Sequence, residues 1–179
     1  VTKIRDKAFY SCFDILSAVI PNSVTEIGEF AFSCSNLSAV IIPDSVTVIG
    51  RNAFSGCSRL KEISLPKQIT VIEEDLLCQC EGLTEIIIPE NVKSIKGSAF
   101  SECISLTSVS FPDGLRSIEN YAFSGCESLE KITLPKSLKA IGDGVFAGCD
   151  KLSVIYYEGT KQEWEAIEKH YNWDNDSSF

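Results

Sequence analysis

The apolar residues of this chain return every 22 or 23 residues along nearly its whole length. Within residues 43–65, eight positions are apolar and stay apolar in both of the next two repeats, 23 and 46 residues further on. These positions are Val46, Ile49, Ala53, Phe54, Cys57, Leu60, Ile63 and Leu65. A repeat of roughly 20 to 50 residues predicts a solenoid, in which each repeat is one coil that packs on its neighbours. The repeat continues without a linker, so the sequence predicts one continuous domain.

Each coil is expected to hold two extended segments and one helical turn. Apolar and polar residues alternate near the end of the unit, where Ile63 and Leu65 flank Ser64. Together with Leu60, this pattern is typical of a short strand with one face inward. Pro66 ends this strand, because proline has no N–H to donate to a ladder. Residues 46–49 favour a second, weaker extended segment. The Ala-Phe-x-x-Cys segment that follows has the spacing of a short helical turn.

Glycine follows the second extended segment in three coils, at Gly28, Gly50 and Gly142. Glycine at such a position suits a turn with positive φ. Glu73 and Lys96 fill the same position in other coils, so a positive φ is not expected to be obligatory there.

Stacked coils place equivalent residues about 4.8 Å apart, so like side chains should form columns. The expected aromatic column consists of Phe9, Phe32, Phe54, Phe100, Phe123 and Phe146. One coil carries Leu76-Leu77 in place of Ala-Phe, a swap that conserves part of the volume.

Seven of the eight cysteines are also periodic and predict a second column. These are Cys12, Cys34, Cys57, Cys80, Cys103, Cys126 and Cys149. Their even total invites disulfides, but neighbours in a column have parallel Cβ vectors. We therefore interpret them as buried thiols that act as small apolar groups. Cys78, outside the column, is expected to be more exposed.

The unit Ile/Leu-Pro-x-x-Val-x-x-Ile-Gly-x-x-Ala-Phe-x-Gly-Cys-x-x-Leu-x-x-Ile resembles the BspA-type leucine-rich repeat. The resemblance covers residues 1–157 and implies a right-handed curved solenoid whose concave face is lined by strands. It also implies an extracellular or cell-surface location and the binding of partner proteins, with no fixed catalytic residues. Two departures stand near the start: Ser33-Cys34 lacks the expected glycine, and residues 13–16 are irregular.

The period ends after Leu152, and a cap is expected to follow. Thr160 and Glu163 form the pattern of a capping box, and Trp164, Ile167 and Tyr171 would share one helical face. We therefore predict a solenoid of about seven coils over residues 1–157, the first of them partial. A capping helix over 158–173 and a flexible tail over 174–179 complete the chain. A sugar-binding aromatic platform on Trp164 and Trp173 is the alternative role for the cap.

Composition narrows the functional classes. The 179 residues carry a net charge of −9 with a pI near 4.7, which argues against nucleic acid and anionic membrane surfaces. No apolar run approaches the roughly 18 residues of a membrane span, so no membrane insertion of this segment is expected. Residues 1–4 match residues 24–27, so we expect the chain to be a piece of a longer protein.

The sequence offers no catalytic group, metal site or cofactor motif. Nucleophilic catalysis needs a base beside cysteine or serine, and His170, the only histidine, is far in sequence from every periodic cysteine except Cys149. The cysteine spacing does not fit a zinc site, and no glycine-rich phosphate loop occurs. The acidic run at residues 73–75 is interpreted as a solvated edge, with calcium binding as the alternative.

The outward residues of the longer strands are the candidate binding site. The predicted site residues are Ile41, Glu62, Ser64, Glu85, Ile87, Ser108, Ser110, Lys131, Thr133 and Tyr156. This surface is mixed in character and lacks a cluster of Trp, Tyr and Arg. The resulting hypothesis is a non-enzymatic interaction or adhesion module that binds a protein or glycan on this face. The alternatives are a passive spacer that displays another domain and, as the least favoured, an enzyme.

Overall fold

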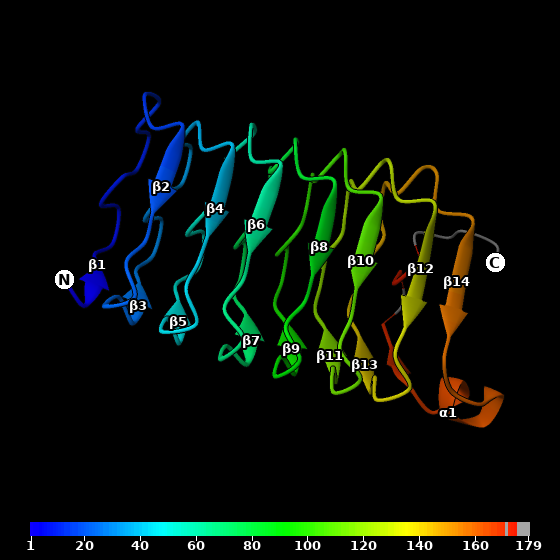
Figure 1. The fold of residues 1–179 in the computed structure, drawn as a ribbon. Coiled ribbons are helices and arrows are strands. Elements are labelled where there is room, and N and C mark those ends of the chain that lie inside the picture. The colour runs from blue at the N-terminus through cyan, green and yellow to red at the C-terminus, as the bar shows by residue number, and fades with distance from the viewer. Residues whose placement is uncertain (171, 175–179) are drawn as a thin grey trace.

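The chain forms a stack of parallel coils, as the repeat predicts. The computed structural model describes residues 1–170 and 172–174. Each coil contributes two short strands, and equivalent strands of successive coils lie side by side along the stack (Figure 1). The predicted solenoid of about seven coils is therefore confirmed.

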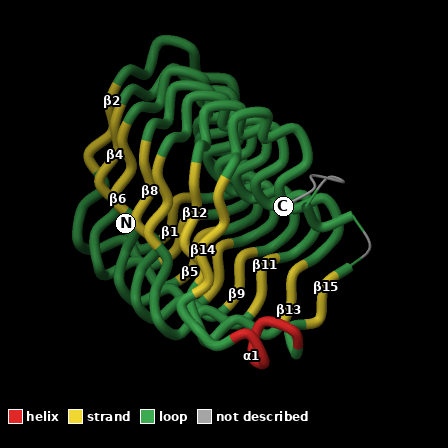
Figure 2. The backbone as a smooth tube through the Cα atoms, turned by 90° about the vertical axis from the view of Figure 1, so that its right-hand side faces the viewer, coloured by secondary structure: helices red, strands yellow, loops and turns green. Residues whose placement is uncertain are grey.

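The strands form two parallel ladders on different sides of the coils (Figure 2). The longer-strand ladder contains β2 (Ser17–Val19), β4 (Ala39–Ile41), β6 (Glu62–Ser64), β8 (Glu85–Ile87), β10 (Ser108–Ser110), β12 (Lys131–Leu134) and β14 (Val154–Tyr157). The short-strand ladder contains β1 (Lys3–Ile4), β3 (Glu26–Ile27), β5 (Val48–Ile49), β7 (Val71–Ile72), β9 (Ser94–Ile95), β11 (Ser117–Ile118), β13 (Ala140–Ile141) and β15 (Glu168–Lys169).

Strand pairing is interrupted at defined points. The longer-strand ladder divides into β2-β4-β6, β8-β10 and β12-β14, and the short-strand ladder into β1-β3-β5 and β7-β9-β11-β13-β15. Within residues 1–170, both ladders are therefore broken between the third and fourth coils. Backbone bonds in the turns still cross this junction, for example from the N–H of Phe54 to the carbonyl of Leu76. The junction coincides with the coil in which Leu77 interrupts the aromatic column.

The core lies between the two ladders and contains the predicted aromatic column. Phe32 stacks on Phe54 with ring centroids 5.3 Å apart, and Phe100 stacks on Phe123 at 5.1 Å. Leu76 and Leu77 are buried where the Ala-Phe pair is replaced. The strand alternation is confirmed as well: Ile86 is buried while its neighbours on β8 are exposed.

The thiol column differs from the prediction at Cys34. Its backbone N–H donates to the carbonyl of Ser55, and the N–H of Gly56 donates to that of Cys78. Cys34 therefore occupies the position of Gly56, and Ser35 takes the column position, with its Oγ 3.4 Å from Cys57 Sγ. The shift arises because the turn that follows the column position is one residue shorter in this coil. One residue separates Ser35 from Leu37, whereas two separate Cys57 from Leu60.

The five column thiols from Cys57 to Cys149 are buried and hydrogen-bonded, not merely apolar. Cys57 Sγ donates to the carbonyl of Phe32 at 3.2 Å, and Cys103 Sγ donates to that of Leu77 at 3.3 Å. Each carbonyl belongs to the preceding coil. The prediction of buried free thiols is confirmed for Cys57, Cys80, Cys103, Cys126 and Cys149, and Cys78 is partly exposed as expected. Cys12, in the first coil, is also only partly buried.

The three glycines expected to suit a positive φ do not adopt it, and other positions of the coil do. Gly28, Gly50 and Gly142 lack it, and a Cβ there would lie 2.6 Å from a backbone nitrogen of the preceding coil. Glycine is used at these positions because two coils approach closely.

Two other positions of each coil adopt positive φ, for example Asn52 (57°) and Gly56 (71°). The predicted helical turn is consequently a series of tight turns. The N–H of Ser55 donates within the coil to Asn52, while the N–H groups of Phe54 and Gly56 donate to the next coil.

The cap contains a shorter helix than the predicted 158–173. Helix α1 spans Lys161–Glu165 and begins with the predicted capping box between Thr160 and Glu163. Ile167 is buried, but it lies beyond the helix, and β15 then pairs with β13 as a further rung of the short-strand ladder. Tyr171 and residues 175–179, most of the predicted tail, lie outside the described residues.

Trp173 extends the aromatic column into the cap. Its ring meets Phe146 with centroids 6.5 Å apart and Trp164 with centroids 5.5 Å apart, both edge to face. Trp164 in turn contacts Tyr157 at 5.3 Å. The cap therefore extends the core beyond the last full coil. Helix α1 stands where a proline begins the turn between the two strands in the other coils.

Candidate binding surface

The longer-strand ladder brings the ten predicted site residues onto one exposed surface, which we call the strand face. Its residues are Ile41, Glu62, Ser64, Glu85, Ile87, Ser108, Ser110, Lys131, Thr133 and Tyr156, and all of them are exposed. They face outward because inward and outward side chains alternate on each strand. Where strands pair, equivalent residues stand in register, as Glu85 with Ser108 and Thr133 with Tyr156.

The strand face has a polar column and an apolar column. Carboxylates occupy the middle of the polar column at Glu62 and Glu85, and Lys131 follows two coils later. The apolar column includes Ile41 and Ile87, with 74% and 73% of their surface exposed, and Tyr156 with 57%. Ser64, Ser110 and Thr133 separate these apolar side chains. These apolar side chains are available for burial against a protein partner, which would remove their surface from water.

Val19 also belongs to the strand face, and the sequence analysis missed it. It stands in register with Ile41, and 95% of its surface is exposed. The first coil is irregular over residues 13–16, which hid its strand. A signal was nevertheless present, because Val19-Ile20-Pro21 matches Ile41-Ile42-Pro43. The apolar column therefore begins one coil earlier than predicted.

The thiols of Cys78, Cys80 and Cys103 are held in the protonated form, which is a poor nucleophile. Burial raises the pKa of Cys80 and of Cys103 well above the ordinary value, so both stay protonated. Burial, and then the charges of Asp75 and Glu102, raise the pKa of Cys78 to about 11. His170 Nδ1 lies 3.6 Å from the carboxylate of Asp143, and both side chains are about half exposed.

The acidic run at residues 73–75 lies on the turn edge beside an open cavity of about 690 Å³. Lys96 Nζ also lines this cavity and lies 2.7 Å from Glu119. The acidic edge is therefore neutralised in part by the protein's own lysine. Among the described residues, no three His, Cys, Asp or Glu side chains gather as metal ligands.

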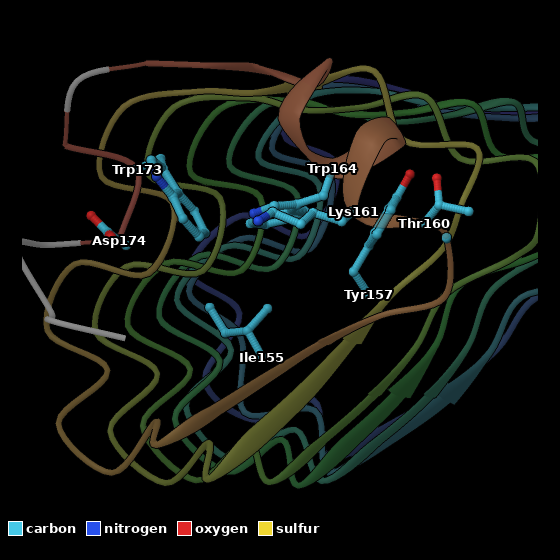
Figure 3. A pocket seen from close by; sticks show the side chains of 8 residues that line it. Ile155, Tyr157, Thr160, Lys161, Trp164, Trp173 and Asp174 are labelled. Atoms are coloured by element: carbon cyan, nitrogen blue, oxygen red, sulfur yellow. The ribbon is translucent and has the colours of Figure 1, made fainter.

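A second open cavity, of about 440 Å³, lies at the C-terminal end of the stack (Figure 3). Ile155 and Tyr157 of β14 line it from one side, and Trp164 and Trp173 of the cap line it from the other. Lys169 Nζ stands 4.4 Å from the centre of the Trp164 ring and donates to the carbonyl of Trp164. This lysine covers one face of the indole that the sugar-platform hypothesis needs open.

Comparison with known proteins assigns the fold to a family. The model of the BspA type leucine rich repeat region matches residues 1–96 and 71–170. The chain belongs to the BspA-type leucine-rich repeat family, as the resemblance of the repeat unit implied. This family is typically non-enzymatic, and its repeats suggest a protein-interaction or surface module.

Three solved structures illustrate the similarity. A leucine-rich repeat protein from Bacteroides ovatus has 30% identity and a TM-score of 0.86, over 94% of this chain and 43% of its own. One from Eubacterium ventriosum has 26% identity and a TM-score of 0.75, over 90% of this chain and 44% of its own. A leucine rich cell surface protein from Faecalibacterium prausnitzii has 28% identity and a TM-score of 0.50, over 96% and 61%.

The chain thus spans less than half of the first two of these proteins. A search of curated proteins finds no significant match. Across the described residues, no helix has both the length and the apolar character that crossing a bilayer requires.

Proposed function

We propose that the chain is a non-enzymatic interaction module of a surface or secreted protein, and that it binds a partner protein on the strand face. The observation that carries this proposal is the apolar column of Val19, Ile41, Ile87 and Tyr156. These side chains are exposed on a rigid ladder, and no described segment covers them. Burying these exposed apolar side chains against a partner would be favourable, because it removes apolar surface from water.

The family and its relatives support the location and the role. The Faecalibacterium prausnitzii relative is described as a cell surface protein. A protein partner is favoured over a glycan because the column offers isolated aliphatic side chains and a single exposed tyrosine. Sugar recognition generally uses flat aromatic rings flanked by polar groups, and the strand face presents such a ring only at Tyr156. The passive spacer is the competing function.

The test compares two aspartate substitutions on opposite ladders. Ile87→Asp places a charge in the apolar column, and Val48→Asp places the same charge on β5, where Val48 is 52% exposed. Binding to a panel of purified extracellular-matrix proteins is measured by surface plasmon resonance. Ile87→Asp should weaken binding by about tenfold or more, because a truncated hot spot costs at least 1 to 2 kcal/mol. Val48→Asp should leave binding unchanged.

The same measurement separates the rival functions. Equal affinity of the Ile87→Asp and Val48→Asp variants for a bound partner would refute the strand face as the site. Absence of any partner across proteins and glycans would favour the spacer. Circular dichroism on both variants checks that the solenoid is intact, which is expected because both side chains point to solvent.

A further inference from the structure

Strand β14 presents a free edge at the C-terminal end of the stack. It pairs with β12 on one side, and no described strand pairs with its other side. The cap does not close this edge, because β15 continues the short-strand ladder on β13 instead (Figure 2). An unpaired edge is a template for another strand, and proteins commonly protect it with lysine, proline or a bulge. β14 has the sequence Val-Ile-Tyr-Tyr, which contains neither lysine nor proline.

The cavity of about 440 Å³ adjoins this edge. A strand added beside β14 would place an inward-pointing side chain in it. Ile132 and Ile155 stand in register on β12 and β14, and both point into the core. The cavity is lined by Ile155 and, from the cap, by Trp164 and Trp173 (Figure 3). These apolar side chains form its inner wall, whereas the polar groups that line it are those of Thr160, Lys161 and Asp174.

The edge and the cavity together specify the chemistry of an occupant. Free N–H and carbonyl groups at strand spacing recognise an extended polypeptide, and every other pair in this ladder is parallel. A residue opposite Ile155 would point into the cavity, while its two neighbours would point outward like Val154 and Tyr156. The indole of Trp164 is covered on one face by Lys169, which disfavours a stacked sugar.

We propose that the free edge of β14 and the adjoining aromatic cavity form a docking site for an extended peptide. The peptide adds as a strand parallel to β14 and inserts one aliphatic side chain between Ile155, Trp164 and Trp173. This site is separate from the strand face, and it takes a segment of partner protein rather than a folded surface.

The probe is a synthetic peptide with the sequence of residues 130–135, Glu-Lys-Ile-Thr-Leu-Pro, blocked at both ends. This segment already pairs in parallel with the other edge of β14, and its isoleucine stands opposite Ile155. The chain has two tryptophans, and both line the cavity, so intrinsic fluorescence reports on its occupation. A saturable change in tryptophan fluorescence is expected, together with slower hydrogen exchange within residues 154–157.

Two altered peptides test the two parts of the site without any change to the protein. Aspartate in place of the isoleucine should weaken binding by about tenfold or more, because it removes the apolar side chain that fills the cavity and places a charge there. N-methylation of alternate backbone nitrogens should abolish binding, since it removes the donors that face β14. Unchanged binding of either peptide would overturn the proposal.

Protein variants locate the probe. Ile155→Phe narrows the cavity and should weaken peptide binding, whereas Tyr156→Ser, on the outward face of the same strand, should not. Ile87→Asp should also leave peptide binding unchanged, so failure of this site and failure of the strand face are distinguishable. If cello- or malto-oligosaccharides change the fluorescence and the peptide does not, the cavity is a sugar site and the proposal is wrong.

Discussion

The Sγ atom of Cys80 lies 3.2 Å from the carbonyl oxygen of Phe54, which belongs to the preceding coil. The same carbonyl also accepts the backbone N–H of Cys57, so the thiol supplies its second hydrogen bond. Cysteine therefore combines a small apolar volume with a donor that connects adjacent coils. Removal of such a donor leaves a buried carbonyl less satisfied, which costs about 1 kcal/mol.

Thiol labelling should report the raised pKa of Cys78, which is partly exposed. Its pKa of about 11 leaves only about one thousandth of it as thiolate at pH 8. We expect its labelling rate to rise roughly tenfold per pH unit up to about pH 11. Asp75→Asn removes one of the charges that raise this pKa and should speed the reaction at pH 8. The variant serves as its own check, since an unchanged rate would contradict the electrostatic cause.

Phe100→Ala should destabilise the solenoid by about 3–5 kcal/mol, because the side chain is fully buried and stacks on Phe123. Urea unfolding followed by circular dichroism measures the loss. Phe9→Ala is the matched control, since Phe9 occupies the same column but has 37% of its surface exposed. Equal losses for the two variants would show that the column does not define the core.

Gln79→Gly should be neutral or stabilising by up to about 1 kcal/mol. Gln79 has φ of 60°, a conformation that costs an L-residue about 1–2 kcal/mol and glycine little. Ser101→Gly is the control, because Ser101 lies outside the positive-φ positions and should lose about 0.5–1 kcal/mol. Thermal unfolding of the two variants gives the comparison, and a larger loss for Gln79→Gly would refute the argument.

Acid should loosen the cap through Glu163. The backbone N–H of Thr160, and then its hydroxyl, hold the pKa of the Glu163 carboxyl below its ordinary value of 4.5. The folded cap therefore favours the charged form. Its contribution to stability is present above about pH 4.5 and is lost as the pH falls through the lower folded pKa. The adjacent Trp164 should report this loss as a fluorescence step.

Glu163→Gln provides the comparison for the acid titration. The glutamine amide does not titrate, so its cap should show a smaller fluorescence step between pH 5 and pH 2. Identical titrations of the two proteins would mean that another group controls the cap.

The sequence predicted features that repeat and missed those that depend on a single coil or on tertiary contact. The ladder strands, the Phe32–Phe54 stack and the Thr160 capping box followed from pattern alone. The coil that contains Cys34 is one residue shorter than the later ones, and the sequence allows the missing residue to be placed either before or after Cys34. Cys34 was therefore assigned to the wrong position of the coil. Only inter-coil hydrogen bonds show that the deletion follows Ser35.

The cap shows the other limit. Nothing in the spacing of Trp173 indicates that it completes the aromatic column, because that contact depends on β15 returning to β13. The strand face was predicted from alternation, yet Val19 was missed where the first coil departs from the repeat. The role of the strand face remains a prediction, since sequence periodicity defines which side chains face outward and not what they meet.

The missing strand pairs between the third and fourth coils also bear on how the molecule responds to force. Two blocks of coils meet there through turn hydrogen bonds and side-chain packing, and Leu77 replaces the stacked phenylalanine at the same level. Tension applied to the two termini should part the blocks at this seam before either block unravels. A force–extension measurement should therefore show a first rupture that leaves the coils of both blocks folded.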